Sequence, residues 1–95
     1  MITMTIIVKL RPEKLEEFLQ TIHSLNGDSK KHKGLKKFTS YREIDDQNGF
    51  NLTYEWETQE DLDRFSGSEE FRVLLGALRV LCEKSEIRYN PFGKR

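Results

Sequence analysis

Residues 50–57 read FNLTYEWE, and this stretch decides the fold because apolar and polar side chains alternate along its whole length. Phe50, Leu52, Tyr54 and Trp56 fall on one side of such an alternation. A period of two is typical of a β-strand with one buried face, since successive side chains of a strand point to opposite sides. We therefore expect a strand here, with its aromatic side directed toward a core.

A hairpin is expected just before this strand. The dipeptide Asn48-Gly49 is typical of tight turns between antiparallel strands, because both residues tolerate positive φ angles. Residues 35–44 then provide the partner strand, with Phe38 and Ile44 on one face and Tyr41 on the other. This pattern predicts an antiparallel pair in the middle of the chain.

The N-terminal part predicts a strand followed by a helix. Pro12 suits the first turn of a helix, where a missing N–H leaves no hydrogen bond unmade. Apolar residues then recur at helical spacing up to Gly27, which we expect to end this helix. The preceding strand covers residues 2–10, and its apolar face carries Ile2, Met4, Ile6, Val8 and Leu10.

After the central strand the chain predicts a helix in two pieces and a last strand. Thr58 and Asp61 resemble a capping box, in which Thr58 caps the first piece and Asp61 reaches back. The break follows at residues 66–68, where Ser68 can cap the second piece. The last strand is expected over residues 85–90.

This order of elements predicts an α+β, ferredoxin-like βαββαβ fold. Its four-stranded antiparallel sheet carries helices on one face only. Residues 1–95 are expected to form a single domain, because a chain of this size buries only about 60–65% of its unfolded surface and has material for one core.

The composition argues against several classes of function. Sixteen basic and sixteen acidic residues cancel, whereas a nucleic-acid-binding protein usually has a basic excess. The single cysteine, Cys82, excludes an internal disulfide and a multi-cysteine metal site. No stretch approaches the roughly 20 apolar residues of a membrane span, and residues 1–5 lack a secretion signal pattern, so we expect a cytoplasmic protein.

The uncovered face of the sheet is a candidate interface. It can be an ordinary solvent-exposed face of the sheet, or it can pack against the same face of a second copy of the chain. We favour the homodimer, in which basic and acidic groups pair across the two-fold axis because an unpaired buried charge is costly. The residues expected on this face are Thr3, Thr5, Ile7, Lys9, Thr39, Tyr41, Thr53, Glu55 and Arg88.

Five aromatic residues are candidates for a binding site on the helix side. Trp56 and Tyr54 share a strand face, where they either pack as core or line the wall of a site for a flat aromatic molecule. Phe38, Phe65 and Phe71 are expected to face the same interior. Core packing alone is the simpler explanation for each of them.

The two histidines differ in their expected surroundings. His23 lies at the edge of the apolar stripe of the first helix; it either packs there or acts as the general base of a site. His32 sits among the lysines of residues 30–37, and we interpret this segment as a solvated loop. Cys82 follows an apolar helix end and is expected to be a buried, inert thiol.

Two segments carry a resemblance to a known family. Residues 55–62, EWETQEDL, and residues 68–71, SEEF, resemble the antibiotic biosynthesis monooxygenase family. The resemblance implies a ferredoxin-like monomer, a dimeric α+β barrel, and a pocket between each sheet and its own helices. It also implies oxygenation of quinols or polyketide phenols without a metal or flavin cofactor, although some relatives bind or degrade haem.

The chain departs from the family at three positions. Quinol-oxidising relatives carry histidines where this chain has Phe65 and Glu70, and haem-degrading relatives carry a tryptophan and a histidine where it has Phe65 and Leu75. Leu75 cannot ligate iron, which disfavours haem. The first hypothesis is a small cofactor-independent monooxygenase for a quinol or polyketide-like aromatic, with His23 as its base. The alternative is a non-catalytic dimeric protein that binds a small molecule.

Overall fold

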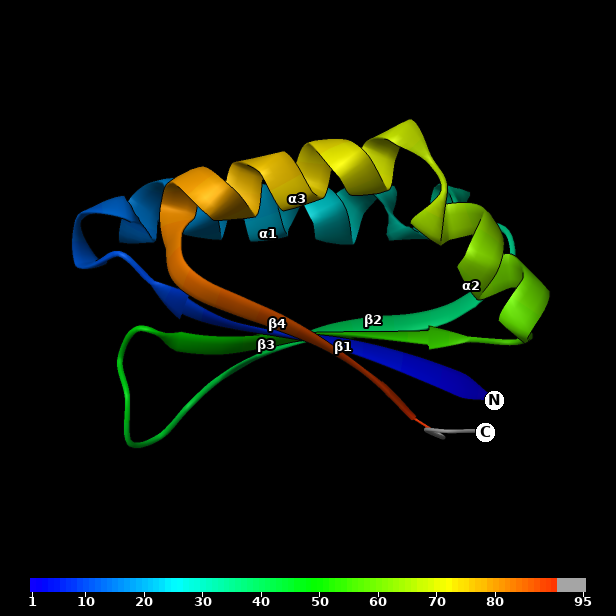
Figure 1. Ribbon diagram of the computed structural model, residues 1–95, viewed down its shortest axis with the longest axis horizontal. Coiled ribbons are helices and arrows are strands. Elements are labelled where there is room, and N and C mark those ends of the chain that lie inside the picture. The colour runs from blue at the N-terminus through cyan, green and yellow to red at the C-terminus, as the bar shows by residue number, and fades with distance from the viewer. Residues whose placement is uncertain (91–95) are drawn as a thin grey trace.

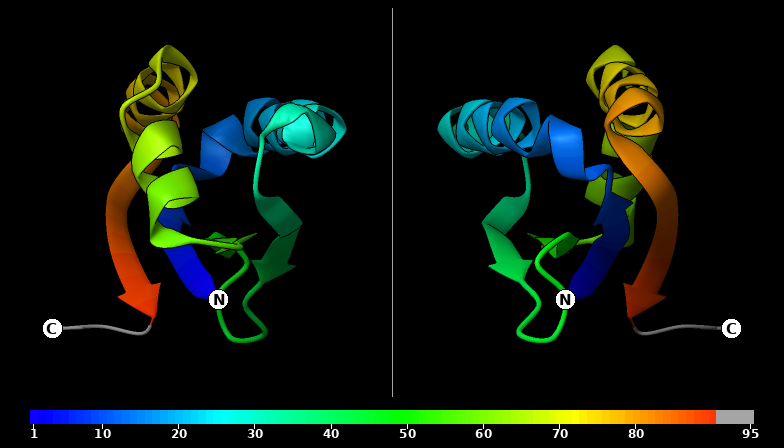
Figure 2. Two further views of the ribbon diagram at one scale, coloured as in Figure 1. Left: turned by 90° about the vertical axis from the view of Figure 1, so that its right-hand side faces the viewer. Right: turned by 90° about the vertical axis from the view of Figure 1, so that its left-hand side faces the viewer.

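Strand β3 (Gly49–Trp56) lies inside a four-stranded antiparallel sheet whose strand order is β2-β3-β1-β4. The computed structural model describes residues 1–90, apart from the side chain of Ser29. Helices α1 and α3 cover one face of the sheet and α2 lies at one end of it, while no helix of the described chain covers the other face (Figures 1 and 2). The other elements are β1 (Ile2–Leu10), α1 (Leu15–Asp28), β2 (Leu35–Arg42), α2 (Gln59–Ser66), α3 (Glu69–Leu81) and β4 (Cys82–Asn90). The ferredoxin-like α+β fold is therefore confirmed.

The core is built on the alternating strands, as the sequence predicts. Trp56 pairs with Ile2 and Tyr54 with Met4, so the aromatic side of β3 continues into the apolar side of β1. Phe38 of β2 pairs with Tyr54 from the other side. The buried side chains of β1 and β3 are Met4, Ile6, Val8, Leu10, Phe50, Leu52, Tyr54 and Trp56.

The first helix does not end at Gly27. A 3-10 turn, Pro12–Lys14, leads into α1, which continues to Asp28 and passes into a second 3-10 turn, Ser29–Lys31. The left-handed conformation that commonly ends a helix is found instead at Gly34, whose φ is 82°. The chain therefore reverses only at Gly34, and residues 32–34 fold back over the end of β3.

The predicted helix break is confirmed. The Thr58 hydroxyl accepts a hydrogen bond from the Asp61 N–H at 3.1 Å and donates one to the Asp61 carboxylate at 2.8 Å. The Ser68 hydroxyl accepts from the Phe71 N–H at 3.2 Å at the start of α3. These two caps fix the angle between α2 and α3, and α2 closes one end of the space above the sheet (Figure 1).

Two strand boundaries differ from the prediction. Strand β2 ends at Arg42, and Ile44 is 99% exposed rather than sharing a face with Phe38, because residues 45–48 turn toward β1. This turn is held by hydrogen bonds from the Leu10 N–H to the Asn48 carbonyl at 2.7 Å and from the Gly49 N–H to the Asp46 carbonyl at 3.0 Å.

Strand β4 begins at Cys82, three residues before the predicted start. Its first half pairs with the end of β1 at the sheet edge, where Leu10 lies opposite Cys82. Most of its side chains are exposed there, so polar residues are tolerated and the apolar pattern is weak. Among residues 1–90, none of the helices has the length and apolar character needed to span a membrane.

Candidate functional site

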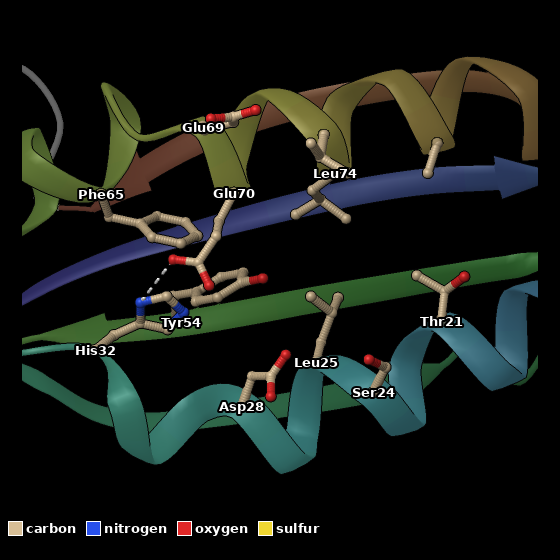
Figure 3. Close-up of a pocket in the computed structure, with 12 residues that line it drawn as sticks. Thr21, Ser24, Leu25, Asp28, His32, Tyr54, Phe65, Glu69, Glu70 and Leu74 are labelled. Atoms are coloured by element: carbon tan, nitrogen blue, oxygen red, sulfur yellow. Dashed lines mark ion pairs between the residues drawn. The ribbon is translucent and has the colours of Figure 1, made fainter.

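A cavity of about 600 Å³ lies between α1 and α3, above the aromatic side of β3 (Figure 3). Its wall combines side chains from α1, α2, α3, β3 and the loop before β2. The lining residues are Thr21, Ser24, Leu25, Asp28, His32, Tyr54, Phe65, Glu69, Glu70, Val73, Leu74 and Ala77.

The aromatic candidates divide into wall residues and supporting residues. Tyr54 and Phe65 line this cavity, with ring centroids 5.3 Å apart. Trp56 stacks beside Tyr54, with centroids at 6.2 Å and planes only 5° apart. Phe38 packs on Tyr54 at 4.7 Å and Phe71 on Phe65 at 5.2 Å, without lining the cavity. Phe38 and Phe71 therefore hold the wall residues in place.

His32 lies at the end of this cavity, and its interpretation as a solvated loop residue is wrong. Its side chain is only 18% exposed. The imidazole packs edge-on against Phe65 at 5.0 Å and lies 6.5 Å from the Trp56 ring. Its Nδ1 is 3.7 Å from Glu70 Oε1, the contact drawn as a dashed line in Figure 3. The structure thus brings an imidazole and a carboxylate together beside the aromatic wall.

The loop geometry explains why His32 reaches this position. Leu35 opens β2 opposite Trp56, so the residues just before it must lie at the Trp56 end of the sheet. The Leu35 N–H donates to the His32 carbonyl at 3.2 Å, and the Glu57 N–H donates to the Gly34 carbonyl at 2.8 Å. These bonds fold His32 inward although its lysine neighbours are exposed.

His23, the candidate base from the sequence, lies elsewhere. Its side chain is exposed on α1 and is not among the residues that line this cavity. The structure therefore does not bring it together with Tyr54 or Trp56.

A smaller cavity of about 310 Å³ adjoins the first at the α2 end. The two cavities share His32, Phe65 and Glu70 in their walls. Trp56 lines the smaller cavity and Tyr54 the larger one. The remaining lining residues of the smaller cavity are Lys31, Lys33, Asp61, Arg64 and Ser68.

Two buried donors in these walls have no hydrogen-bond partner within residues 1–90: the Tyr54 hydroxyl and the Trp56 Nε1–H. Burial raises the pKa of Tyr54 well above its usual value, so this hydroxyl keeps its proton. An unsatisfied buried donor costs about 1–3 kcal/mol, and native proteins retain few of them. Both groups are therefore suited to donate to an oxygen atom of a bound molecule.

Asp61 lies in the wall of the smaller cavity and is held there by two hydrogen bonds. Its carboxylate accepts from Arg64 Nη1 at 2.8 Å and from the Thr58 hydroxyl at 2.8 Å. The bond from Arg64, followed by that from Thr58, lowers the pKa of Asp61. The carboxylate is therefore ionised near neutral pH and holds Arg64 beside the cavity.

Cys82 and the acidic groups give no sign of metal or thiol chemistry. Burial raises the pKa of Cys82 to about 11, and the buried thiol lines neither cavity. The thiolate is the reactive form, so this thiol is inert near neutral pH. Among residues 1–90, no group of three or more histidine, cysteine, aspartate or glutamate side chains could hold a metal ion.

A ferredoxin-like α+β domain with a cavity between its sheet and its own helices defines the class of this protein. The family model for antibiotic biosynthesis monooxygenases matches residues 1–75, and the chain belongs to this family. No curated protein matches the sequence significantly.

Solved structures show the same fold. A conserved protein from Methanosarcina mazei is 25% identical, with a TM-score of 0.84 over 93% of this chain and 88% of its own. An antibiotic biosynthesis monooxygenase is 16% identical, with a TM-score of 0.81 over 94% of this chain and 95% of its own. A Deinococcus radiodurans protein, proposed to be such a monooxygenase, is 12% identical, with a TM-score of 0.88 over 100% of this chain and 95% of its own.

Proposed function

We propose that this protein is a cofactor-independent monooxygenase that oxidises a quinol or a related electron-rich phenol in the larger cavity. The observation that carries the proposal is the imidazole of His32, held against Phe65 and beside Glu70 in the cavity wall. We further propose that residues 1–95 act as one unit, of which 91–95 lie outside the described residues. The cytoplasmic location stays a prediction.

His32 is suited to act as the general base. Nδ1 faces the Glu70 carboxylate, which leaves Nε2 free to accept the proton of a substrate hydroxyl. Glu70 then stabilises the imidazolium that forms, because opposite charges attract strongly where water is partly excluded. Tyr54 can donate its unpaired hydroxyl to the oxygen that becomes negative.

The chemistry balances without a cofactor. Proton transfer from the substrate hydroxyl to His32 leaves an anion that passes one electron to dioxygen. The resulting radical and superoxide combine to form a carbon–oxygen bond, and the peroxide takes a proton from the imidazolium. Loss of water then leaves one oxygen atom on the substrate carbon as a carbonyl. The substrate itself supplies all the electrons, as hydroquinone plus dioxygen gives hydroxyquinone plus water.

His32 can supply the imidazole that this chain lacks at the two family histidine positions. Quinol-oxidising relatives carry histidines where this chain has Phe65 and Glu70, and these two side chains are the ones that flank His32. We infer that this chain supplies from the loop before β2 the imidazole that those relatives supply from their later helices. The aromatic ring and the carboxylate then support the base instead of providing it.

Oxygen uptake tests this function. We expect the protein to consume dioxygen above the blank rate with 1,4-naphthohydroquinone or anthrone, one molecule per molecule of product. Labelled dioxygen should place one labelled atom in the product and the other in water. Tight binding of these compounds with uptake at the blank rate would instead assign the non-catalytic binding role, and the oxygenase proposal would be abandoned.

We also propose that two copies pack through the uncovered sheet face. This face bears Ile7, half-buried, and Tyr41, 55% exposed, on either side of Asn51. In the neighbouring row of paired residues the hydroxyls of Thr5 and Thr53 approach each other at 3.4 Å. Arg88 pairs with Glu86 of its own strand at 2.9 Å, so its charge is already compensated before burial. Light scattering at micromolar concentration should give twice the chain mass of 11.3 kDa, and a monomeric mass would contradict this arrangement.

A further inference from the structure

The smaller cavity has features that the oxidation of a plain quinol does not use. We propose that it binds a carboxylate carried by the aromatic substrate, so that the substrate class is that of acidic quinols and phenols. The aromatic part of this assignment rests on the proposed function, whereas the carboxylate site rests on the cavity itself. Three observations support it: the shared wall, the charges and the Trp56 donor.

The shared wall lets one molecule occupy both cavities. His32, Phe65 and Glu70 line both spaces, so a flat molecule beside these residues can reach Tyr54 on one side and Trp56 on the other. Figure 3 shows His32, Phe65, Glu70 and Tyr54 converging at one end of the larger cavity. A hydroxyl beside His32 would therefore leave the far end of the ring system within the smaller cavity.

The two cavities differ in charge. The larger one is lined by Asp28, Glu69 and Glu70 and by no lysine or arginine, and it offers no cation to a substrate carboxylate. The smaller one carries the cations Lys31, Lys33 and Arg64 against the two carboxylates of Asp61 and Glu70. Arg64 is paired with Asp61 at 2.8 Å and Lys31 with Asp28 at 3.5 Å, so Lys33 is the cation best placed to attract a ligand. One such cation suits a carboxylate better than a doubly charged phosphate.

Trp56 supplies a donor at the same place. Its side chain is 1% exposed and lines the smaller cavity, and its Nε1–H has no partner within residues 1–90. An unpartnered indole donor near cationic side chains is best satisfied by an anionic oxygen, because hydrogen bonds to charged acceptors are about twice as strong as neutral ones. The cations attract the carboxylate and Trp56 orients it.

Two stable probes test the site in the parent protein. 6-Hydroxy-2-naphthoate carries a hydroxyl and a carboxylate at opposite ends of a rigid ring pair, and 2-naphthol lacks only the carboxylate. We expect the acid to bind at least about fivefold more tightly at low salt, and the preference to shrink at high salt. Trp56 is the only tryptophan, so its single indole N–H resonance reports on the site, and it should shift downfield with the acid more than with 2-naphthol.

Matched double variants separate this site from overall charge. Lys31→Gln/Lys33→Gln removes two charges that line the smaller cavity, and Lys30→Gln/Lys36→Gln removes two neighbouring exposed charges that line neither cavity. The first variant should lose most of the acid preference and the second should keep it. Equal affinities of the two probes for the parent, or equal losses in both variants, would overturn the proposal.

The outcome is independent of catalysis. Oxygen uptake at the blank rate together with the acid preference would remove the oxygenase function and leave the carboxylate site. If the protein oxidises hydroquinones but binds neutral and acidic ones equally tightly, the oxygenase function stands and the carboxylate site is removed.

Discussion

Replacing His32 with glutamine is expected to reduce oxygen uptake with 1,4-naphthohydroquinone at least about a hundredfold. A positioned general base contributes about a hundred- to ten-thousandfold to the rate, and glutamine keeps the polarity of histidine but cannot take up a proton. The side chain is 18% exposed and packs edge-on against Phe65, and glutamine is similar to histidine in size and polarity, so the variant is expected to stay folded. Circular dichroism and the Trp56 indole resonance would check that fold.

The matching change at His23 discriminates between the two histidines of the chain. His23 is exposed on α1 and lies outside both cavities, so His23→Gln should retain the parent rate. A large loss in His23→Gln with an unchanged rate in His32→Gln would reverse the assignment of the base. Glu70→Gln should show an intermediate loss, about tenfold in kcat, because it removes the charge that stabilises the imidazolium while the base remains.

The fold could be predicted because each part of it is encoded locally. The alternation of β3 fixes which of its side chains are buried, and the caps at Thr58 and Ser68 mark where α2 and α3 begin. The boundary errors fall where local signals compete with tertiary contacts. Ile44 is apolar, but the hydrogen bond from the Leu10 N–H to the Asn48 carbonyl draws residues 45–48 toward β1 and leaves Ile44 exposed.

The site could be predicted only in part, and for a physical reason. Tyr54, Trp56 and Phe65 are found because their spacing places them on buried faces. His32 is missed because its neighbours in sequence are exposed lysines, whereas its neighbours in space come from β3, α2 and α3. The register of β2 on β3 was the available signal, since it places the start of β2 opposite Trp56.

Gly34→Ala is expected to lower the free energy of unfolding by about 2–4 kcal/mol. The φ of 82° at Gly34 is a conformation that costs a residue with a Cβ about 1–2 kcal/mol. In addition, a Cβ at this position would collide with the Asp61 carboxylate. The collision would displace Asp61 from its hydrogen bonds to Arg64 and Thr58, and an ionised carboxylate is expensive to leave unpaired.

Gly76→Ala provides the matched control for this change. Gly76 lies in α3, and a Cβ added there meets nothing within 4 Å. Alanine restricts the unfolded chain and favours a helix, so this variant should be more stable than the parent by about 0.5–1 kcal/mol. Urea unfolding followed by circular dichroism measures both values, and a Gly34→Ala protein as stable as Gly76→Ala would contradict the strain argument.

Gly34→Ala also connects the stability of the fold with the proposed chemistry. Gly34 lies two residues after His32, and its carbonyl is fixed by the Glu57 N–H at the end of β3. If Gly34→Ala remains folded at low temperature, relief of the collision must move either the backbone of this loop or Asp61 with Arg64. A moved loop carries His32 away from Phe65 and displaces Lys33 from the smaller cavity, so both oxygen uptake and binding of 6-hydroxy-2-naphthoate fall. A moved Asp61 leaves the base in place and weakens binding of 6-hydroxy-2-naphthoate alone. Measuring both in the folded variant therefore identifies which side of the contact yields, because the loop carries the base and Asp61 does not.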